Sequence, residues 1–451
     1  MLFITKNVCV VFLLSITLPG TLERLSGQIS LRKDFESRIE RELASLVELY
    51  RHLHANPELS FHEVKTAERL QHELQTAGFQ VTASVGGTGI VGVLRNGVGP
   101  TVMIRTDMDA LPITEQTGLE YASRVRTTDD QGNEVGVMHA CGHDIHMATF
   151  VGTARLLSQV KDRWLGTLVM IGQPAEERGG GAKAMIAAGL FEKFPKPDAI
   201  LALHDDATME AGKVGAVDGP ALAGAASVDL TIRGVSGHGA WAYTAKDPIV
   251  LAAQTVLGLQ TIVSRELRAI DPAVITVGSI HGGTKHNIIP DEVKLQITVR
   301  FFSEVVRAQI LASIERIASG MSKAAGVPPD RAPVMKVREE ESVGPTVNSP
   351  KLAPRVRQAI EGVIGQENVV LKEPALGAED FGYYGSTPDK IPICIFWLGA
   401  ASPEKVAESL KPGGKPLPSL HSSIYAPMAA PAIETGAKAM AAAAVELLGK
   451  K

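Results

Sequence analysis

Three short apolar runs, each typical of a buried strand, end just before side chains that can bind a metal ion or move a proton. The runs are 101–105, 167–172 and 199–203, and the residues that follow them are Asp107, Asp109, Glu176, Glu177 and His204. In an open α/β sheet, sites form in the crevice beyond the carboxyl ends of the strands. The pattern therefore predicts an α/β domain, with helices flanking a central sheet, that brings these distant residues together at one edge.

The segment from Met138 to His146 holds three histidines, a cysteine and an aspartate, and a helical apolar pattern follows it. Cys141 and His143 are two residues apart, so both can reach one centre from a turn. A helix N-terminus favours a thiolate at Cys141, and thiolate and imidazole are good ligands for zinc and other borderline metals. The segment is interpreted as half of a metal site. The alternative is a buried cysteine among helix-capping polar residues.

The adjacent carboxylates Glu176 and Glu177 suggest divided roles. One can bind a metal ion while the other takes a proton from an activated water. Most Glu-Glu pairs belong to a solvated surface, but this pair follows a strand and precedes Arg178 and three glycines. That position favours the catalytic interpretation.

Two single histidines and two aspartates extend the candidate site. His204 gains weight as a ligand from its place at a strand end. His421, between a loop rich in glycine and proline and the final helix, is either a ligand or structural. Asp107 and Asp109 could bind metal, orient the metal ligands or cap a helix, and we favour the orienting role.

At 451 residues the chain is longer than one typical domain, so two domains are expected. Between about 222 and 335 the predicted elements follow the order β-α-β-β-α-β of a ferredoxin-like unit. The predicted division is a discontinuous catalytic domain, residues 33–220 and 336–451, and an inserted domain, residues 221–335. His238, in the inserted domain, is either a loop residue or a substrate contact made when the domains close. In the first domain, Ser60 to Glu63 predicts a capping box at the start of a helix.

The N-terminus predicts export. Lys6 precedes a largely apolar run, 8–18, which fits a secretory signal of residues 1–27 better than a membrane span of about 20 apolar residues. The expected location is periplasmic or secreted, with no stable membrane partner after signal cleavage; an uncleaved N-terminal anchor is the alternative. The net charge is -4, and no basic patch argues for a nucleic-acid partner.

Seven motifs give the chain a specific family resemblance. They are Leu53-His-Ala-Asn-Pro-Glu-Leu59, Arg105-Thr-Asp-Met-Asp-Ala-Leu-Pro112, Met138-His-Ala-Cys-Gly-His-Asp144, Gln173-Pro-Ala-Glu-Glu177, Asn287-Ile-Ile-Pro-Asp291, Glu379-Asp-Phe381 and Leu420-His-Ser422. With them the chain, from about residue 46 to 448, resembles the metallo-amidohydrolases and peptidases of family M20. More narrowly it is similar to the amidohydrolase branch, which includes hippurate hydrolases and hydrolases of auxin–amino acid conjugates.

The resemblance implies a two-metal centre and a particular architecture. The implied ligands are Cys141, His143, Glu177, His204 and His421, and the implied general base is Glu176. The implied fold is a zinc-exopeptidase-like catalytic domain with a mixed sheet and an inserted lid that forms a homodimer. A lid histidine and asparagine, here His238 and Asn287, would reach a partner's active site and hold the oxyanion. Mn, Zn, Co and Ni all remain open, because this mixed ligand set excludes none of them.

The implied reaction is hydrolysis of the amide bond of N-acyl amino acids or related small amides. A dipeptidase or aminopeptidase of the same family is the first alternative, and a non-catalytic metal- or ligand-binding protein is the second. Two departures from the family pattern affect the pocket. Asp205-Asp206 add negative charge after His204, and Trp241 and Tyr243 add bulk after His238.

Overall fold

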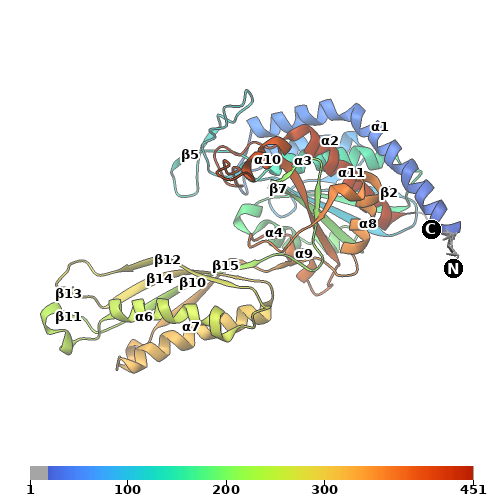
Figure 1. The fold of residues 1–451 in the computed structure, drawn as a ribbon. Coiled ribbons are helices and arrows are strands. Elements are labelled where there is room, and N and C mark those ends of the chain that lie inside the picture. The colour runs from blue at the N-terminus through green and yellow to red at the C-terminus, as the bar shows by residue number, and fades with distance from the viewer. Residues whose placement is uncertain (1–18, 450–451) are drawn as a thin grey trace, which may run out of the picture.

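The computed structural model describes residues 19–449 as two domains, a larger α/β domain and an elongated lid domain that projects from it (Figure 1). The first 18 residues of the predicted export signal lie outside the described residues. The first helix, α1, spans Pro19–Ala55. Within residues 19–449, no helix is long and apolar enough to cross a lipid bilayer.

The larger domain is built on an eight-stranded sheet with the order β1-β2-β6-β3-β7-β18-β8-β17. The bounds are β1 (Gln80–Thr82), β2 (Ile90–Asn96), β6 (Gly166–Gln173), β3 (Thr101–Asp107), β7 (Ala199–Glu210), β18 (Ile393–Ala401), β8 (Val214–Ala216) and β17 (Val369–Leu371). Strands β6, β3, β7 and β18 run parallel, whereas β2 and β8 pair antiparallel with β6 and β18. The predicted mixed sheet is confirmed.

Helices cover both faces of this sheet (Figure 1). One face carries α1, α2 (Val64–Thr76), α3 (His143–Gln159), α8 (Ala353–Ile364) and α11 (Ala429–Leu448). The other carries α4 (Gly181–Ala187), α5 (Leu190–Lys193) and α9 (Gly382–Ser386). Because side chains alternate along a strand, Leu201 packs into the first core and Ile200 into the second. Strands buried on both faces explain the continuous apolar runs of the sequence.

The lid domain has the predicted ferredoxin-like order. Its elements are β10 (Gly224–Arg233), α6 (Pro248–Thr261), β12 (Val274–Gly282), β14 (Glu292–Phe301), α7 (Glu304–Ala324) and β15 (Val334–Val343). The four strands form an antiparallel sheet of order β12-β14-β10-β15, and alternate residues of β10 are buried in the lid's own core. The domain limits at 220/221 and 335/336 stay a prediction, and β15 continues past residue 335.

Several shorter elements lie within or between the two domains. They are β4 (Arg126–Thr128), β5 (Glu134–Gly136), β9 (Pro220–Leu222), β11 (Gly237–His238), β13 (Ile288–Ile289), β16 (Thr346–Val347) and α10 (Pro403–Ser409).

The predicted capping box is wrong. Helix α2 begins at Val64, but the Ser60 hydroxyl donates a 2.6 Å hydrogen bond to Oδ2 of Asp109, far along the chain. The Glu58 carboxylate caps the helix instead, accepting from the backbone N–H of Thr66 at 2.8 Å. Ser60 therefore supports the edge of the sheet where the candidate site lies.

Candidate metal centre

The five predicted metal ligands lie in one cluster. Sγ of Cys141 is 3.6 Å from Nε2 of His204 and 3.2 Å from Nε2 of His421. Oε1 of Glu177 is 3.9 Å from Nε2 of His143, and its Oε2 is 3.5 Å from Nε2 of His421. They come from the start of α3, the turn after β6, the middle of β7 and the loop before α11, so residues far apart in the sequence do come together. The prediction that His204 follows a strand is wrong, because β7 continues past it to Glu210.

Two of the possible three-residue ligand groups in the cluster share Cys141. Ligand atoms of Cys141, His143 and His204 lie within 4.8 Å of one another, as do those of Cys141, Glu177 and His421. The Cys141 thiolate would therefore help to hold a cation in either group. Burial and the negative charge of Glu177 raise the pKa of the Cys141 thiol. The helix N-terminus alone therefore does not stabilise the thiolate form of Cys141 enough. A bound divalent cation would provide the additional stabilisation.

Two buried acceptor atoms without hydrogen-bond partners show that these residues fit divalent metal ions. Nδ1 of His143 lies 2.8 Å from the Asp109 carbonyl oxygen, which fixes Nδ1 as the donor and leaves Nε2 as a free acceptor. Among the described residues, neither this Nε2 nor Oε1 of Glu177 has a hydrogen-bond partner, although both are buried. Buried acceptors without partners cost free energy. A cation between them removes that cost, and imidazole, thiolate and carboxylate are suitable ligands.

Glu176 lies beside the ligands in a turn that Asp109 holds in place. The backbone N–H groups of Glu176 and Glu177 donate to the two Asp109 carboxylate oxygens, each at 3.1 Å. Ala175 has a positive φ of 48°, which turns the chain sharply after β6. Oε2 of Glu176 is 3.9 Å from Nε2 of His143. Burial raises the pKa of Glu176, and the charge of Glu379 raises it further.

Asp107 belongs to a buried network behind the ligands. Its Oδ1 accepts from Nδ1 of His146 at 2.7 Å, and its Oδ2 accepts from Arg105 at 2.6 Å. Arg105 is fully buried and also donates to Glu379 at 2.8 Å and to Asp380 at 3.2 Å. Sequence reasoning gave Arg105 no role of its own, and it interpreted His146 as structural or, at most, as a support for the metal ligands. A signal for His146 was available, because residues three apart on a helix share a face, and His143 is three residues before it.

The negative charge of Asp205 and Asp206 is compensated within the fold. Asp205 accepts from Nε2 of His146 at 3.1 Å and from the Tyr425 hydroxyl, while Asp206 pairs with Lys372 at 2.7 Å. Although burial opposes it, the charge of Asp107 and hydrogen bonds to the two aspartates raise the pKa of His146 to about 9. The backbone N–H of Asp205 also donates to Nε2 of His146 at 2.8 Å, so the ring is held between Asp107 and Asp205.

His238 and Asn287 are not brought to this cluster within the chain. They lie beside each other at the lid end remote from the larger domain, where β11 and β13 pair (Figure 1). The backbone N–H of Gly239 donates to the Asn287 carbonyl at 2.9 Å. The ring of Trp241 stacks near that of His238, with centroids 4.9 Å apart, and Trp241 and Tyr243 are exposed.

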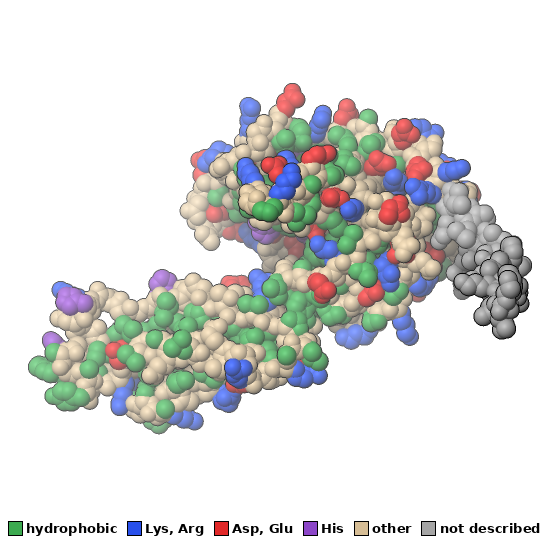
Figure 2. Space-filling model, viewed as in Figure 1, with side chains coloured by type: hydrophobic (Ala, Val, Ile, Leu, Met, Phe, Trp, Pro, Cys, Tyr) green, Lys and Arg blue, Asp and Glu red, His purple; other side chains and the backbone are tan. Residues whose placement is uncertain are grey.

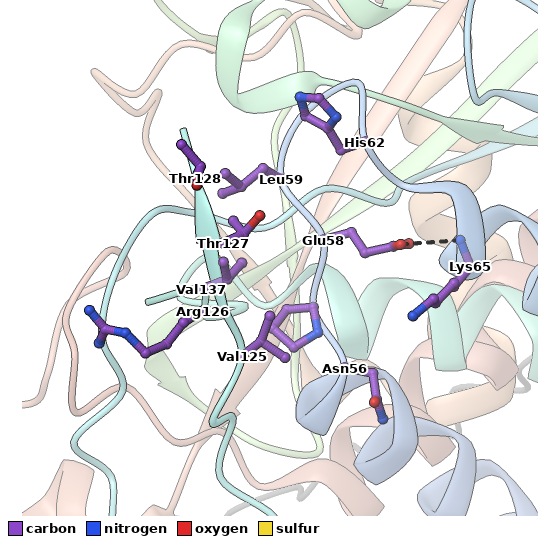
Figure 3. A pocket seen from close by; sticks show the side chains of 11 residues that line it. Asn56, Glu58, Leu59, His62, Lys65, Val125, Arg126, Thr127, Thr128 and Val137 are labelled. Atoms are coloured by element: carbon purple, nitrogen blue, oxygen red, sulfur yellow. Dashed lines mark hydrogen bonds between the residues drawn. The ribbon is translucent and has the colours of Figure 1, made fainter. Parts of the chain in front are cut away.

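Two hollows lie beside the ligand cluster. A cleft of about 510 Å³ between the two domains is lined by Glu176, Glu177 and Glu379 from the larger domain and Arg300 from the lid. A hollow of about 600 Å³ is lined by Asp205, Trp397 and Leu420, neighbours of His204 and His421. A third, of about 310 Å³ between the end of α1 and β4, contains none of the predicted ligands (Figure 3).

A family model, Peptidase family M20/M25/M40, matches residues 103–412. The chain belongs to this peptidase family. IAA-amino acid hydrolase ILR1-like 4 of Arabidopsis thaliana is 37% identical over 75% of this chain and 74% of the relative. N-acetyl-L-cysteine deacetylase of Bacillus subtilis is 35% identical over 81% of each protein. Thermostable carboxypeptidase 2 of Saccharolobus solfataricus is 36% identical over 80% of this chain and 87% of the relative.

Solved structures agree with the family assignment. A putative aminohydrolase from methicillin-resistant Staphylococcus aureus has a TM-score of 0.79 and 31% identity, covering 92% of this chain and 100% of that protein. A dinuclear metal-binding peptidase of the M20 family from Bacillus subtilis has a TM-score of 0.73 and 28% identity, covering 91% of this chain and 99% of that protein. This M20 chain is a metal-dependent hydrolase of amide bonds, of the amidohydrolase branch, as its motifs predict.

Proposed function

We propose that this M20 chain hydrolyses N-acyl amino acids at a two-metal centre, with Glu176 as the general base. One ion would be held by Cys141, His143 and His204, and the other by Cys141, Glu177 and His421. The observation that carries the proposal is the position of Glu176, beside the ligand cluster and on the wall of the cleft between the domains. Two relatives bear names of N-acyl amino acid hydrolases, which supports this substrate class.

The residues divide the reaction between them. Divalent ions bound here would polarise the substrate carbonyl and acidify a water. Glu176 accepts the proton of the attacking water and returns it to the leaving nitrogen. Burial raises the pKa of its carboxyl, which favours proton uptake. Asp109 holds the Glu176-Glu177 turn, and His146 holds Asp107. No covalent acyl-enzyme forms.

The test is hydrolysis by the purified protein with Mn, Zn, Co or Ni added separately. N-acyl amino acids should be cleaved, a chelator should stop the reaction, and the metal that restores it best identifies the working ion. Preference for unblocked dipeptides would assign the chain to the peptidase side of the family, which the carboxypeptidase relative represents. Metal binding without cleavage of either class would contradict the proposal.

Arg300 is the proposed contact for the substrate carboxylate. It lines the cleft with Glu176, is half-buried, and forms no ion pair within residues 19–449. Burial lowers the pKa of its guanidinium, because the charged form loses contact with water and gains no partner. A carboxylate can pair with it in bidentate geometry.

Arg300→Met should raise KM by roughly 10-fold to 100-fold, the value of a charged hydrogen bond of about 1.5–3 kcal/mol, with a smaller change in kcat. Steady-state kinetics on one N-acyl amino acid tests this. Arg265→Met, an arginine on the lid outside the cleft, is the control. An unchanged KM would place the carboxylate elsewhere.

We further propose a homodimer formed through the lid. Val250, Leu257 and Ile280 are exposed on α6 and β12, and β12 is an edge of the lid sheet. Figure 2 shows many apolar side chains on the surface of the lid. Exposed apolar side chains beside an open sheet edge are typical of an interface. Because His238 and Asn287 lie at the remote end of the lid, they could hold the substrate oxyanion only in the partner's site.

Mixing two inactive variants tests this arrangement. If each site uses its own Glu176 and the partner's His238, a hybrid of Glu176→Gln and His238→Ala subunits has one complete site. Random exchange of subunits should then restore about a quarter of wild-type activity, because half the dimers are hybrids with one site each. No recovery, with dimers confirmed by mass, would contradict the shared site.

We also propose that residues 1–27 direct export to the periplasm or outside the cell, or alternatively anchor the chain. The apolar run after Lys6 supports this. N-terminal sequencing of the exported protein distinguishes the two: a start near residue 28 indicates cleavage, and an intact N-terminus indicates an anchor.

A further inference from the structure

The hollow of about 600 Å³ beside His204 has mainly apolar walls. We call it the Trp397 hollow; its apolar lining is Ala207, Leu371, Pro374, Ala375, Trp397 and Leu420. Trp397 stands on β18 in register with His204 on the neighbouring β7, so both side chains leave the same face of the sheet. Leu371 lies at the end of β17, an edge strand of the sheet.

Two of the charged groups on its wall pair with each other. The ammonium of Lys372 pairs with Asp206 at 2.7 Å, and Asp206 also accepts from Thr208. The aliphatic part of Lys372 lies over Gly215, where a Cβ would be 2.7 Å from its Cγ. Gly215 thus makes room for this side chain. Glu373 also lines the hollow and is exposed, while most of the lining surface is apolar.

The Trp397 hollow lies next to the metal ligands, although none of the five ligands lines it. The rings of Trp397 and His204 have centroids 5.6 Å apart. Leu420 immediately precedes His421, and Asp205 immediately follows His204. The cleft that contains Arg300 touches the cluster through Glu176 and Glu177 instead, and the two hollows share no lining residue.

These two hollows match the two ends of one substrate. An N-acyl amino acid has a carboxylate on the amine side of the scissile bond and an acyl group on the other. If the carboxylate pairs with Arg300 in the polar cleft, the acyl group extends from the metal centre toward the Trp397 hollow. The hollow is far larger than an acetyl group, so an acetyl group would leave most of its apolar wall in contact with water.

We propose that the Trp397 hollow binds the acyl group of the substrate, and that Leu371 and Trp397 make this enzyme prefer bulky apolar acyl groups to acetyl. This rests on the proposed function. Family membership does not decide the point, because the relatives include both an N-acetyl-L-cysteine deacetylase and an IAA-amino acid hydrolase.

The test compares N-phenylacetylglycine with N-acetylglycine. Trp397 packs into the core on the sheet face that carries α4, α5 and α9, so its replacement would disturb folding. Leu371 is 68% exposed, so it can be replaced without disturbing the core. The wild type should show the higher kcat/KM with phenylacetyl. Leu371→Glu should lower the phenylacetyl-to-acetyl ratio roughly tenfold or more, and Leu371→Met should keep it. The matched control is Val98→Glu, an equal change at an exposed residue in the turn between β2 and β3.

A second measurement does not depend on turnover. Calorimetry should show that phenylacetate binds the wild type and Val98→Glu equally, and Leu371→Glu about tenfold more weakly. If no N-acyl amino acid is cleaved but this binding pattern holds, the proposed function fails and the hollow assignment stands. A wild-type preference for acetyl, or a ratio and phenylacetate binding unchanged in Leu371→Glu, overturns the assignment. A changed oligomeric mass of Leu371→Glu with an unchanged ratio would assign the hollow to a contact between copies and also overturn it.

Discussion

Glu176→Gln should lower kcat by about 10²-fold to 10⁴-fold, the usual contribution of a general acid–base group, while the protein keeps its metal. Glutamine keeps the shape of the side chain and cannot take up a proton. The backbone N–H of residue 176, which Asp109 holds, does not change, so the Glu177 ligand stays in place. The measurements are kcat on an N-acyl amino acid and metal content by elemental analysis.

The control for that experiment is Glu408→Gln, the same change on the exposed end of α10. It should leave both quantities at wild-type values. High activity retained in Glu176→Gln would remove the base assignment. Lost metal together with lost activity would make Glu176 a ligand instead.

Cys141→Ser should release metal from both halves of the centre. Cys141 is the member common to the two three-residue groups, and a serine hydroxyl is a far weaker ligand than a thiolate. Loss of a residue that only supports a ligand typically weakens metal affinity by about 10-fold to 100-fold, so loss of a shared ligand should cost at least that much. Metal stoichiometry after dialysis, and titration of metal back into the protein, measure the effect.

Cys394→Ser is the matched control. Cys394 is buried in β18 among apolar side chains, and burial raises the pKa of its thiol to about 12. This variant should lose stability and keep its metal stoichiometry, because it removes a core contact and no ligand. Unchanged stoichiometry and affinity in Cys141→Ser would mean that the histidines and Glu177 hold the ions without the thiol.

The order of apolar runs and polar residues was enough to predict the sheet and the place of the site. Continuous apolar runs need burial on both faces, and parallel strands end at a common edge, so Glu176 and Glu177 meet Asp109 there. His204 joins them from inside β7, which the sequence pattern did not predict. The β-α-β-β-α-β order likewise predicted the lid, because alternation along β10 marks a strand with one face on a core. These patterns depend only on residues that are close together along the chain, so they can be recognised in the sequence.

The partners of buried polar groups followed from the tertiary structure alone. Ser60 matched a helix cap locally, yet it bonds Asp109, and no local pattern pairs Arg105 with Glu379, 274 residues away. The partners of Asp205 and Asp206 are His146 and Lys372, which are also distant in the sequence.

The sequence by itself determined which residue types follow the apolar runs, and with them the chemistry of the centre. The tertiary structure decided what supports each of them, that His238 and Asn287 lie far from the chain's own centre, and that a polar and an apolar hollow both border the ligands. The physical reason is one of range. Secondary structure follows from spacing along the chain, whereas hydrogen-bond partners and cavities depend on how distant segments pack.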